Sequence, residues 1–274
     1  MAGFGARGLK KPLLLNPGTL EEYRGISFAA GGDLNETTVP NFIMRYNPHV
    51  LGPSIGKRMI SYCADDKRVD RLNGALSGAS SMNIETELDY LIPVSALQAI
   101  QALNMDEDWK LINIMIGNMD QCRACNMDDP RIAIEMYGSF LENAVDRIHK
   151  NVPRALVNLS ESDDVEKDLT YQPSLVGSFE TSRLFPIVAD KPYCRPIKLL
   201  DIEVNYFECP CGHNDQTRRI MDQVAAGYNQ QLKRIYEKYN AVEEENFAVM
   251  FTPAAVNFSS LALDHLRQAF TSGE

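Results

Sequence analysis

A short apolar run near the middle of the chain stops abruptly at a glycine, and few folds accommodate such a pattern. Residues 112–116 read Ile-Asn-Ile-Met-Ile, and the polar residues Asn118, Asp120 and Gln121 lie just beyond Gly117. A short apolar run bounded by a turn residue is typical of a buried strand in a parallel sheet. In open α/β sheets, ligands bind beyond the carboxyl ends of the strands. The segment therefore predicts a parallel sheet and indicates where its functional site lies.

Strand and helix patterns alternate along the rest of the chain. The predicted strands cover residues 69–79, 110–116, 155–159 and 247–251, the first of them running into a small-residue turn. The predicted helices cover residues 39–46, 94–103, 129–148, 217–239 and 261–270. The third helix has the clearest signal, because Asp129 can cap it, Pro130 suits its first position and apolar residues follow at helical spacing. Strands and helices joined by long crossovers indicate a parallel sheet with helices on both faces.

Composition limits the class of protein. A chain of 274 residues with 45% hydrophobic and 23% charged residues predicts one globular domain over residues 1–274, with a cysteine-bearing insertion at about 161–215. The net charge is −10 and no block of like charge dominates the sequence, which argues against nucleic acid as a partner. No run of eighteen apolar residues is present, so the sequence contains no transmembrane helix.

Cysteines and glycosylation sequons together favour an extracellular ancestry. The six cysteines are Cys63, Cys122, Cys125, Cys194, Cys209 and Cys211, and Asn35, Asn158 and Asn257 begin Asn-x-Ser/Thr triplets. The apolar stretch 12–15 is too short for a signal peptide, so either the protein is intracellular or its true N-terminus is missing. Two alternatives to disulfides remain open. One is a zinc site that combines Cys122-x-x-Cys125 with Cys209-x-Cys211-Gly212-His213, although the spacing of its second half is unusual for zinc. The other is a thioredoxin-like redox pair formed by Cys122 and Cys125.

Two segments resemble sequence blocks of the SGNH, or GDSL-type, hydrolases. Residues 72–79 (Leu-Asn-Gly-Ala-Leu-Ser-Gly-Ala) resemble the second block, and residues 116–120 (Ile-Gly-Asn-Met-Asp) resemble the third. Other stretches are similar to the membrane-associated phospholipase B branch of that family: 26–33, 39–41, 46–48, 108–111, 122–125, 152–155 and 209–211. The similarity covers nearly the whole chain in the family's order.

This resemblance implies a three-layer α/β/α sandwich with a flavodoxin-like parallel sheet, and a serine esterase that needs neither metal nor cofactor. Family members stabilise an oxyanion with a glycine amide, here at Gly78, and with an asparagine side chain from the third block. In this chain Met119 stands at the asparagine position, and Asn118 is displaced by one residue, between Gly117 and Asp120. A thioether cannot donate a hydrogen bond. On a strand end, a shift of one residue would also turn the side chain to the opposite face.

The family's nucleophile and base have no counterpart in the sequence. The G-D-S-L block is expected just before Met1, together with the first strand of the sheet, and the D-x-x-H block just after Glu274. Residues 146–149 match D-x-x-H as a string but lie inside a predicted helix, and neither Ser77 nor Ser80 has an identifiable base. Residues 1–274 by themselves are therefore expected to be inactive. The chain is interpreted either as part of a phospholipase B-like esterase or as a non-catalytic module that binds lipid or a protein.

The resemblance carries further expectations. It agrees with a Cys122–Cys125 disulfide and with a second one joining Cys194 to Cys209 or Cys211, which would leave Cys63 as the odd thiol or as a partner of the remaining cysteine. Gly32 and Asp33 could line a cleft, although turn chemistry explains them equally well. Trp109 is interpreted as packing where a strand begins, with a lipid anchor as the alternative. The expected partner is a phospholipid or lysophospholipid, with contact to a membrane surface, and the parent family is extracellular or membrane-associated.

Overall fold

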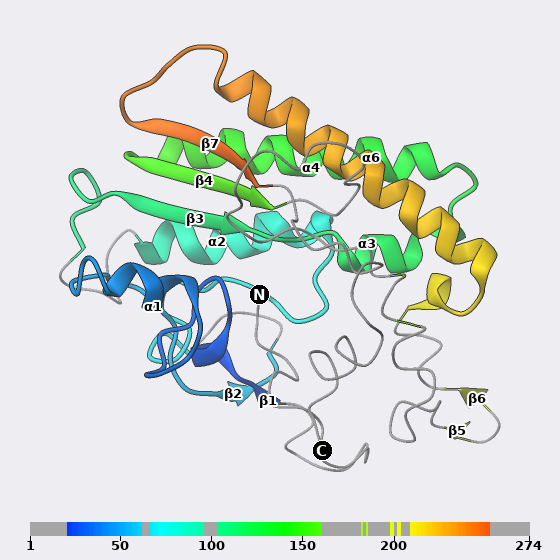
Figure 1. Ribbon diagram of the computed structural model, residues 1–274, viewed down its shortest axis with the longest axis horizontal. Coiled ribbons are helices and arrows are strands. Elements are labelled where there is room, and N and C mark those ends of the chain that lie inside the picture. Colours follow the sequence, from blue (N-terminus) through cyan, green and yellow to red (C-terminus); the bar gives the residue numbers. More distant parts are fainter. Residues whose placement is uncertain are drawn as a thin grey trace. The chain divides into compact units, whose positions relative to one another are not determined.

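The computed structural model describes residues 21–61, 66–95, 103–160 and 209–252, together with residues 182, 185, 198–199 and 202–203. Two compact units make up the chain, and Figure 1 shows their elements. The first unit comprises Met1–Lys110 and Asp146–Ala155, and the second comprises Leu111–Val145 and Leu156–Glu274. The assignment of residues 1–274 to one domain stays a prediction.

The first unit is built from short elements. Strands β1 (Glu21–Glu22) and β2 (Arg58–Met59) pair antiparallel, which places Glu22 opposite Arg58. Helix α1 (Val39–Met44) confirms the helix predicted around Pro40, and its N-cap Thr38 accepts a hydrogen bond from the amide of Asn41. A single-turn helix, Ser81–Asn83, leads directly into α2 (Ile84–Ser95).

Two predictions for the first unit were wrong. No strand forms over residues 69–79, because Arg71 and Gly78 adopt positive φ angles and the side chain of Asn73 accepts a hydrogen bond from the Ala75 amide, which produces turns. The helix predicted over 94–103 begins ten residues earlier, since Ser80 and Asn83 form a capping box ahead of α2. Residues 96–102 lie outside the described part of the chain.

The second unit contains a parallel sheet of three strands in the order β3-β4-β7, as predicted (Figure 1). The strands are β3 (Lys110–Ile114), β4 (Ala155–Ser160) and β7 (Phe247–Thr252). Burial alternates along the middle strand: Ala155, Val157 and Leu159 are fully buried, whereas Leu156 and Asn158 are half-buried. This period of two identifies one face of the sheet as the face that packs against helices.

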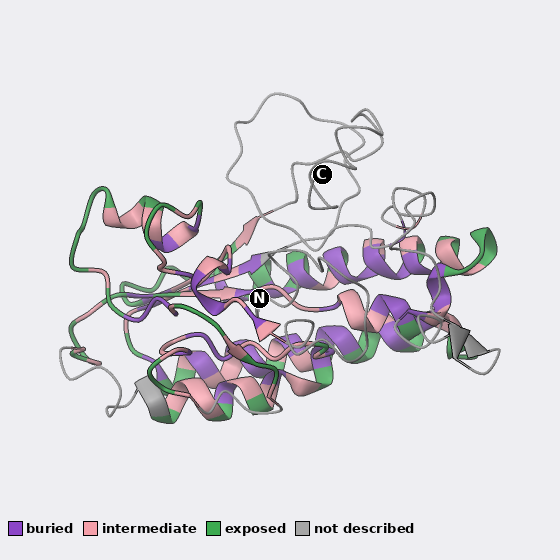
Figure 2. Ribbon diagram, turned by 90° about the horizontal axis from the view of Figure 1, so that it is seen from below, coloured by how far each residue is buried: buried purple, intermediate pink, exposed green. Residues whose placement is uncertain are grey.

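Helices α4 (Pro130–Asn151) and α6 (Asp215–Tyr239) follow β3 and β4 and confirm the two long helices predicted from periodicity. They pack closely: the rings of Tyr137 and Tyr228 stack with centroids 3.9 Å apart, and Gly138 lies against the side chain of Gln231. Because both crossovers proceed in the same direction across the sheet, right-handed connections place both helices on one face. Figure 2 shows buried residues along one side of these helices and exposed residues along the other.

The parallel sheet and its crossover helices agree with the predicted α/β sandwich. The part of the 161–215 insertion that the structure describes includes the antiparallel pair β5 (Lys198–Leu199) and β6 (Ile202–Glu203), and a single-turn helix, Pro210–Gly212. The helix predicted at 261–270 lies outside the described residues. Within the described part of the chain, no helix combines the length and the apolar character needed to cross a bilayer.

Candidate functional site

The chain turns sharply where β3 ends. Gly117 has a φ of 123°, a conformation that side-chain-bearing residues rarely adopt, and α3 (Asn118–Arg123) begins at the next residue. The amide of Gln121 donates to the Gly117 carbonyl at 2.9 Å, which closes the first turn of this helix. The polar segment predicted to follow the strand therefore lies at the carboxyl end of a parallel strand, the position at which α/β sheets bind ligands.

The stacked rings of Tyr137 and Tyr228 pack against this turn at Gly117. A Cβ atom built on Gly117 would lie 3.0 Å from the Tyr137 ring, so a larger residue here would require that ring to shift by a few tenths of an ångström. The Tyr137 hydroxyl donates to the Ile116 carbonyl at 3.2 Å. Burial raises the pKa of Tyr137 and of Tyr228, and the negative charge of Asp120 adds to the increase. Both phenols therefore stay protonated, and Asp120 lies near enough to affect them.

Asn118 and Met119 occupy the first turn of a helix. The expectation that they point to opposite faces was based on a strand end, and it was wrong because the strand stops at Ile114 and residue 118 is already helical. Successive helical residues are rotated by about 100° around the axis, not 180°. Both side chains are half-buried. Asn118 thus brings a side-chain amide to the first residue of this helix, adjacent to the thioether of Met119.

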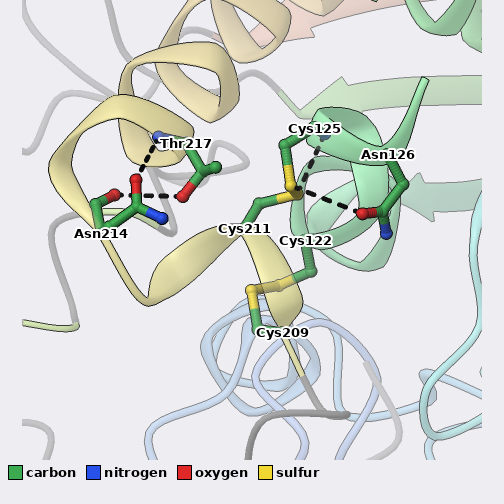
Figure 3. Close-up of a disulfide and its surroundings, with 7 residues drawn as sticks. All are labelled: Cys122, Cys125, Asn126, Cys209, Cys211, Asn214 and Thr217. Carbon is green, nitrogen blue, oxygen red and sulfur yellow. Dashed lines mark hydrogen bonds between the residues drawn. A yellow bond between two sulfur atoms is a disulfide. The ribbon is translucent and has the colours of Figure 1, made fainter. Parts of the chain in front are cut away.

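Two disulfides join α3 and the single-turn helix that follows it, Ala124–Asn126, to the segment that precedes α6 (Figure 3). Cys122 pairs with Cys209 and Cys125 pairs with Cys211, with Cα–Cα distances of 4.5 and 5.6 Å. The predicted Cys122–Cys125 bond was wrong, as was the pairing of Cys194 with Cys209 or Cys211. Residues three apart on a helical segment lie on one face, so the two sulfurs reach the same neighbouring segment side by side. Cys63 and Cys194 lie outside the described residues.

This pairing also decides between the chemical alternatives for the cysteines. A zinc site needs free thiolates, and all four sulfurs of the CxxC and CxC motifs are consumed in disulfides. A thioredoxin-like redox pair would join Cys122 to Cys125, which the structure does not do. The fully buried Met221 belongs to the same apolar cluster as three of these cysteines, and the half-buried Phe185 packs against that cluster. The four cysteines therefore form a pair of structural disulfides close in sequence to the turn at Gly117.

Gly78, the second predicted oxyanion residue, lies in the first unit on an exposed turn with a φ of 77°. The segment before it is tied to buried polar groups. Arg24 donates to the carbonyls of Asn73 and Ala75, and the Leu76 amide donates to the Glu87 carboxylate at 2.9 Å. This turn is therefore held by side chains that are distant in the sequence.

Four buried charges support that turn, and sequence reasoning missed all of them. They are Glu22, Arg24, Arg58 and Asp70, three of them with side chains that are 0% exposed. Asp70 accepts a hydrogen bond from Nε of Arg58 at 2.8 Å and forms an ion pair with Nε of Arg24 at 2.7 Å. Glu22 forms an ion pair with Arg58 at 3.0 Å. No local pattern marks such residues, because isolated charges in a sequence are usually solvated.

The other polar candidates have structural roles. Asp33 accepts a hydrogen bond from the Gly56 amide at 2.8 Å, and the Gly32 amide donates to the Ser54 carbonyl, as the turn interpretation predicted. The D-x-x-H string is part of α4, with Ile148 fully buried and Arg147 paired with Glu85 and Asp89.

The two serines near Gly78 also form hydrogen bonds within the fold: Ser77 donates to Glu22, and Ser80 caps a helical turn.

The interpretation that Trp109 packs where a strand begins was wrong, because 58% of its surface is exposed.

The sequons differ in their surroundings. Asn35 is exposed in a turn with a φ of 66°. Asn158 lies in the middle strand β4, where its side-chain nitrogen donates to Asn113 at 3.0 Å and its oxygen accepts from Thr252 at 2.7 Å. These contacts form a polar ladder across the three strands. Asn257 lies outside the described residues.

Comparison with known proteins agrees with these features. The sequence profile of the family described as GDSL-like Lipase/Acylhydrolase matches residues 22–264. Membrane-associated phospholipase B1 of Rattus norvegicus is 28% identical over 239 residues, which cover 86% of this chain and 15% of the rat protein. The Homo sapiens phospholipase B1 is 34% identical over 146 residues, covering 52% of this chain and 10% of the human protein. The chain thus spans a small part of these relatives. No solved structure matches.

Proposed function

Because the chain belongs to the GDSL-like lipase/acylhydrolase family, we propose that it forms part of a phospholipase B-like esterase, which hydrolyses acyl esters of phospholipids or lysophospholipids. The observation that carries this proposal is the turn at Gly117, which places Asn118 at the carboxyl end of a parallel strand. The matched relatives are named phospholipase B1, which supports the lipid class of substrate. Two disulfides support an extracellular or membrane-associated location.

In this proposal the chain supplies groups that stabilise the oxyanion of an acyl-transfer reaction. The Gly78 amide and the Asn118 side chain would donate hydrogen bonds to the negative oxygen of the tetrahedral intermediate. Asn118 takes this role because Met119 has no hydrogen to donate. Loss of one such donor typically lowers turnover by about 10²–10³. The groups that hold Gly117 and Gly78 would act before the reaction, by fixing the donors.

The nucleophile and base would have to come from outside residues 1–274. The sequence contains no G-D-S-L motif, and no D-x-x-H follows the last described strand. The D-x-x-H string at residues 146–149 lies inside α4, where Arg147 forms ion pairs with Glu85 and Asp89 and Ile148 is fully buried. Residues 1–274 alone are therefore proposed to lack hydrolytic activity.

The test compares fatty-acid release from lysophosphatidylcholine by two proteins. One is residues 1–274, and the other is the translation product of the complete source transcript. We expect turnover from the complete protein if it contains the G-D-S-L serine, loss of that turnover when the serine is changed to alanine, and none from residues 1–274. In the complete protein, Asn118→Ala should lower kcat by about 10²–10³, whereas Met119→Leu should leave it nearly unchanged. Turnover by residues 1–274 alone would contradict the proposal.

A second candidate function is a non-catalytic module that binds lipid. Met119 favours it, because a substitution inside the third block removes the donor that the family uses at that position. Under this alternative, residues 1–274 would retain lysophosphatidylcholine in equilibrium dialysis, and the complete protein would bind it without releasing fatty acid. A complete protein with serine-dependent turnover would eliminate this alternative.

A further inference from the structure

We infer that Glu87 and Arg24 are positioning residues, which hold the segment 75–77 so that the backbone of Gly78 is presented in one conformation. The inference rests on the proposed function, since it concerns the amide proposed to bind the oxyanion. It goes beyond that function by assigning roles to two residues that lie outside both family blocks.

The first observation is that the turn before Gly78 has little backbone structure of its own. Residues 71–79 form neither helix nor strand, and Gly78 has a positive φ with no atom within 4 Å of a Cβ built on it. A turn of this kind would sample many conformations in water. An oxyanion donor contributes most when its direction is set before the charge develops.

The second observation is that side chains from distant elements bind this turn residue by residue. Arg24 donates to the Ala75 carbonyl at 2.6 Å and also to the carbonyl of Asn73. The Leu76 amide donates to Glu87 at 2.9 Å, and the hydroxyl of Ser77 donates to Glu22. Three successive residues before Gly78 are thus anchored by a buried arginine and two carboxylates.

The third observation is that Arg24 cannot easily take another position. Its side chain is 0% exposed, its Nε lies 2.7 Å from Asp70, and its remaining nitrogens serve the two carbonyls. A planar guanidinium with donors in a fixed fork can satisfy a carboxylate and two carbonyls at once, which a lysine ammonium cannot do with the same geometry. Asp70 is in turn fixed by Arg58, at 2.8 Å.

Glu87 offers the sharper test, because it lies on α2 and is only half-buried. Glu87→Gln keeps an oxygen that can accept from the Leu76 amide, whereas Glu87→Leu has a similar size and no acceptor. The matched control is Glu85→Leu. It removes a carboxylate two residues away on the same helix, whose partner is Arg147 and not the turn.

The experiment measures backbone amide exchange by NMR in residues 1–274 and these variants. We expect Glu87→Leu to speed the exchange of the Leu76 amide about tenfold, the effect of losing one typical hydrogen bond. Amides of α2 should keep their rates, and Glu87→Gln and Glu85→Leu should behave like the unchanged chain at Leu76. Arg24→Lys should speed exchange at Ala75, whose amide donates to Asn73. Equal effects of Glu87→Leu and Glu87→Gln, or equal acceleration throughout the first unit, would overturn the inference.

A second readout separates this inference from the proposed function. Sodium decanoate carries a carboxylate on an acyl chain, and its titration is expected to shift the Gly78 amide resonance, with weaker binding in Glu87→Leu than in Glu87→Gln. No response of Gly78 in the unchanged chain would contradict its role in the proposed function. The exchange rates at Leu76 would still decide whether Glu87 positions the turn, because they require neither ligand nor hydrolysis.

Discussion

The backbone amide of Cys125 donates a hydrogen bond, at 3.0 Å, to the sulfur of Cys211, the residue to which its own side chain is joined by a disulfide. The second bridge, Cys122–Cys209, lies one helical turn away (Figure 3). Together they connect α3 and the single-turn helix after it to the segment just before α6, at two neighbouring points. The turn that carries Asn118 is therefore covalently tied to the helix whose Tyr228 supports it.

The two bridges should contribute to stability in a strongly non-additive way. Each spans 86 or 87 residues, which is worth about 4.5 kcal/mol by loop entropy. When one bridge is present, the other closes only a small ring, worth roughly 2 kcal/mol. Removing either pair, as C122A/C209A or C125A/C211A, should therefore lower the free energy of unfolding far less than removing both. Denaturant titration measures these free energies. If the quadruple variant loses no more unfolding free energy than the two double variants lose together, the prediction is contradicted.

Gly117→Ala should destabilise the protein more than Gly78→Ala. At Gly117 an added methyl meets the Tyr137 ring at 3.0 Å in addition to an unfavourable φ of 123°, and the expected cost is about 3 kcal/mol. At Gly78 only the backbone conformation is unfavourable, and the expected cost is about 1 kcal/mol. Urea unfolding of the two variants compares them directly. Equal losses would mean that contact with the tyrosine pair does not constrain the turn.

Glycan occupancy should differ between the two described sequons. In a secretory expression host, Asn35 is expected to carry a glycan because it is exposed in a turn. Asn158 is expected to remain unmodified, because the nitrogen that would receive the sugar donates to Asn113 within the sheet. Peptide mass spectrometry after enzymatic deglycosylation reads both sites, with Asn35→Gln as the control for the first. Substantial occupancy at Asn158 would show that modification precedes formation of the polar ladder.

The pH dependence of stability should report Glu87. Burial raises the pKa of this carboxyl above its ordinary value of 4.5, although the hydrogen bond from the Leu76 amide opposes the rise. The folded state then holds the proton more tightly than the unfolded state, so the stability that Glu87 provides is full below pH 4.5 and is lost as the pH rises through the raised pKa. Glu87→Gln mimics the protonated form. Its unfolding free energy relative to the unchanged chain should therefore increase with pH over this range.

Glu142 serves as a control for that experiment, because its pKa is shifted in the opposite direction. Its pKa is lowered mainly by the hydrogen bond from Lys238, with a further contribution from Arg234. Its stabilising effect is present above the unfolded-state pKa and is lost as the pH falls through the lowered value. Glu142→Gln should therefore become less stable than the unchanged chain as the pH rises. Parallel pH trends in the two variants would contradict the assignment for Glu87.

Local patterns predicted the elements that depend on local physics. The strands β3, β4 and β7 and the helices α4 and α6 were all predicted close to their observed bounds. In each of them, the spacing of the apolar residues matches the repeat of a strand or of a helix over the whole length of the element. The glycine after the apolar run marked the candidate site for the same reason, since a positive φ at Gly117 is a local requirement.

By itself, the sequence determined the α/β class, the parallel strands and the family blocks, because each is encoded within a stretch of neighbouring residues. The tertiary structure alone decided which cysteines pair, since partners 86 and 87 residues apart meet only when residues 118–126 and the segment before α6 are packed together. It also decided that Asn118 lies on a helix and that Arg24 and Glu87 hold the turn before Gly78. Their geometry depends on contacts between distant segments, and no local spacing records such contacts.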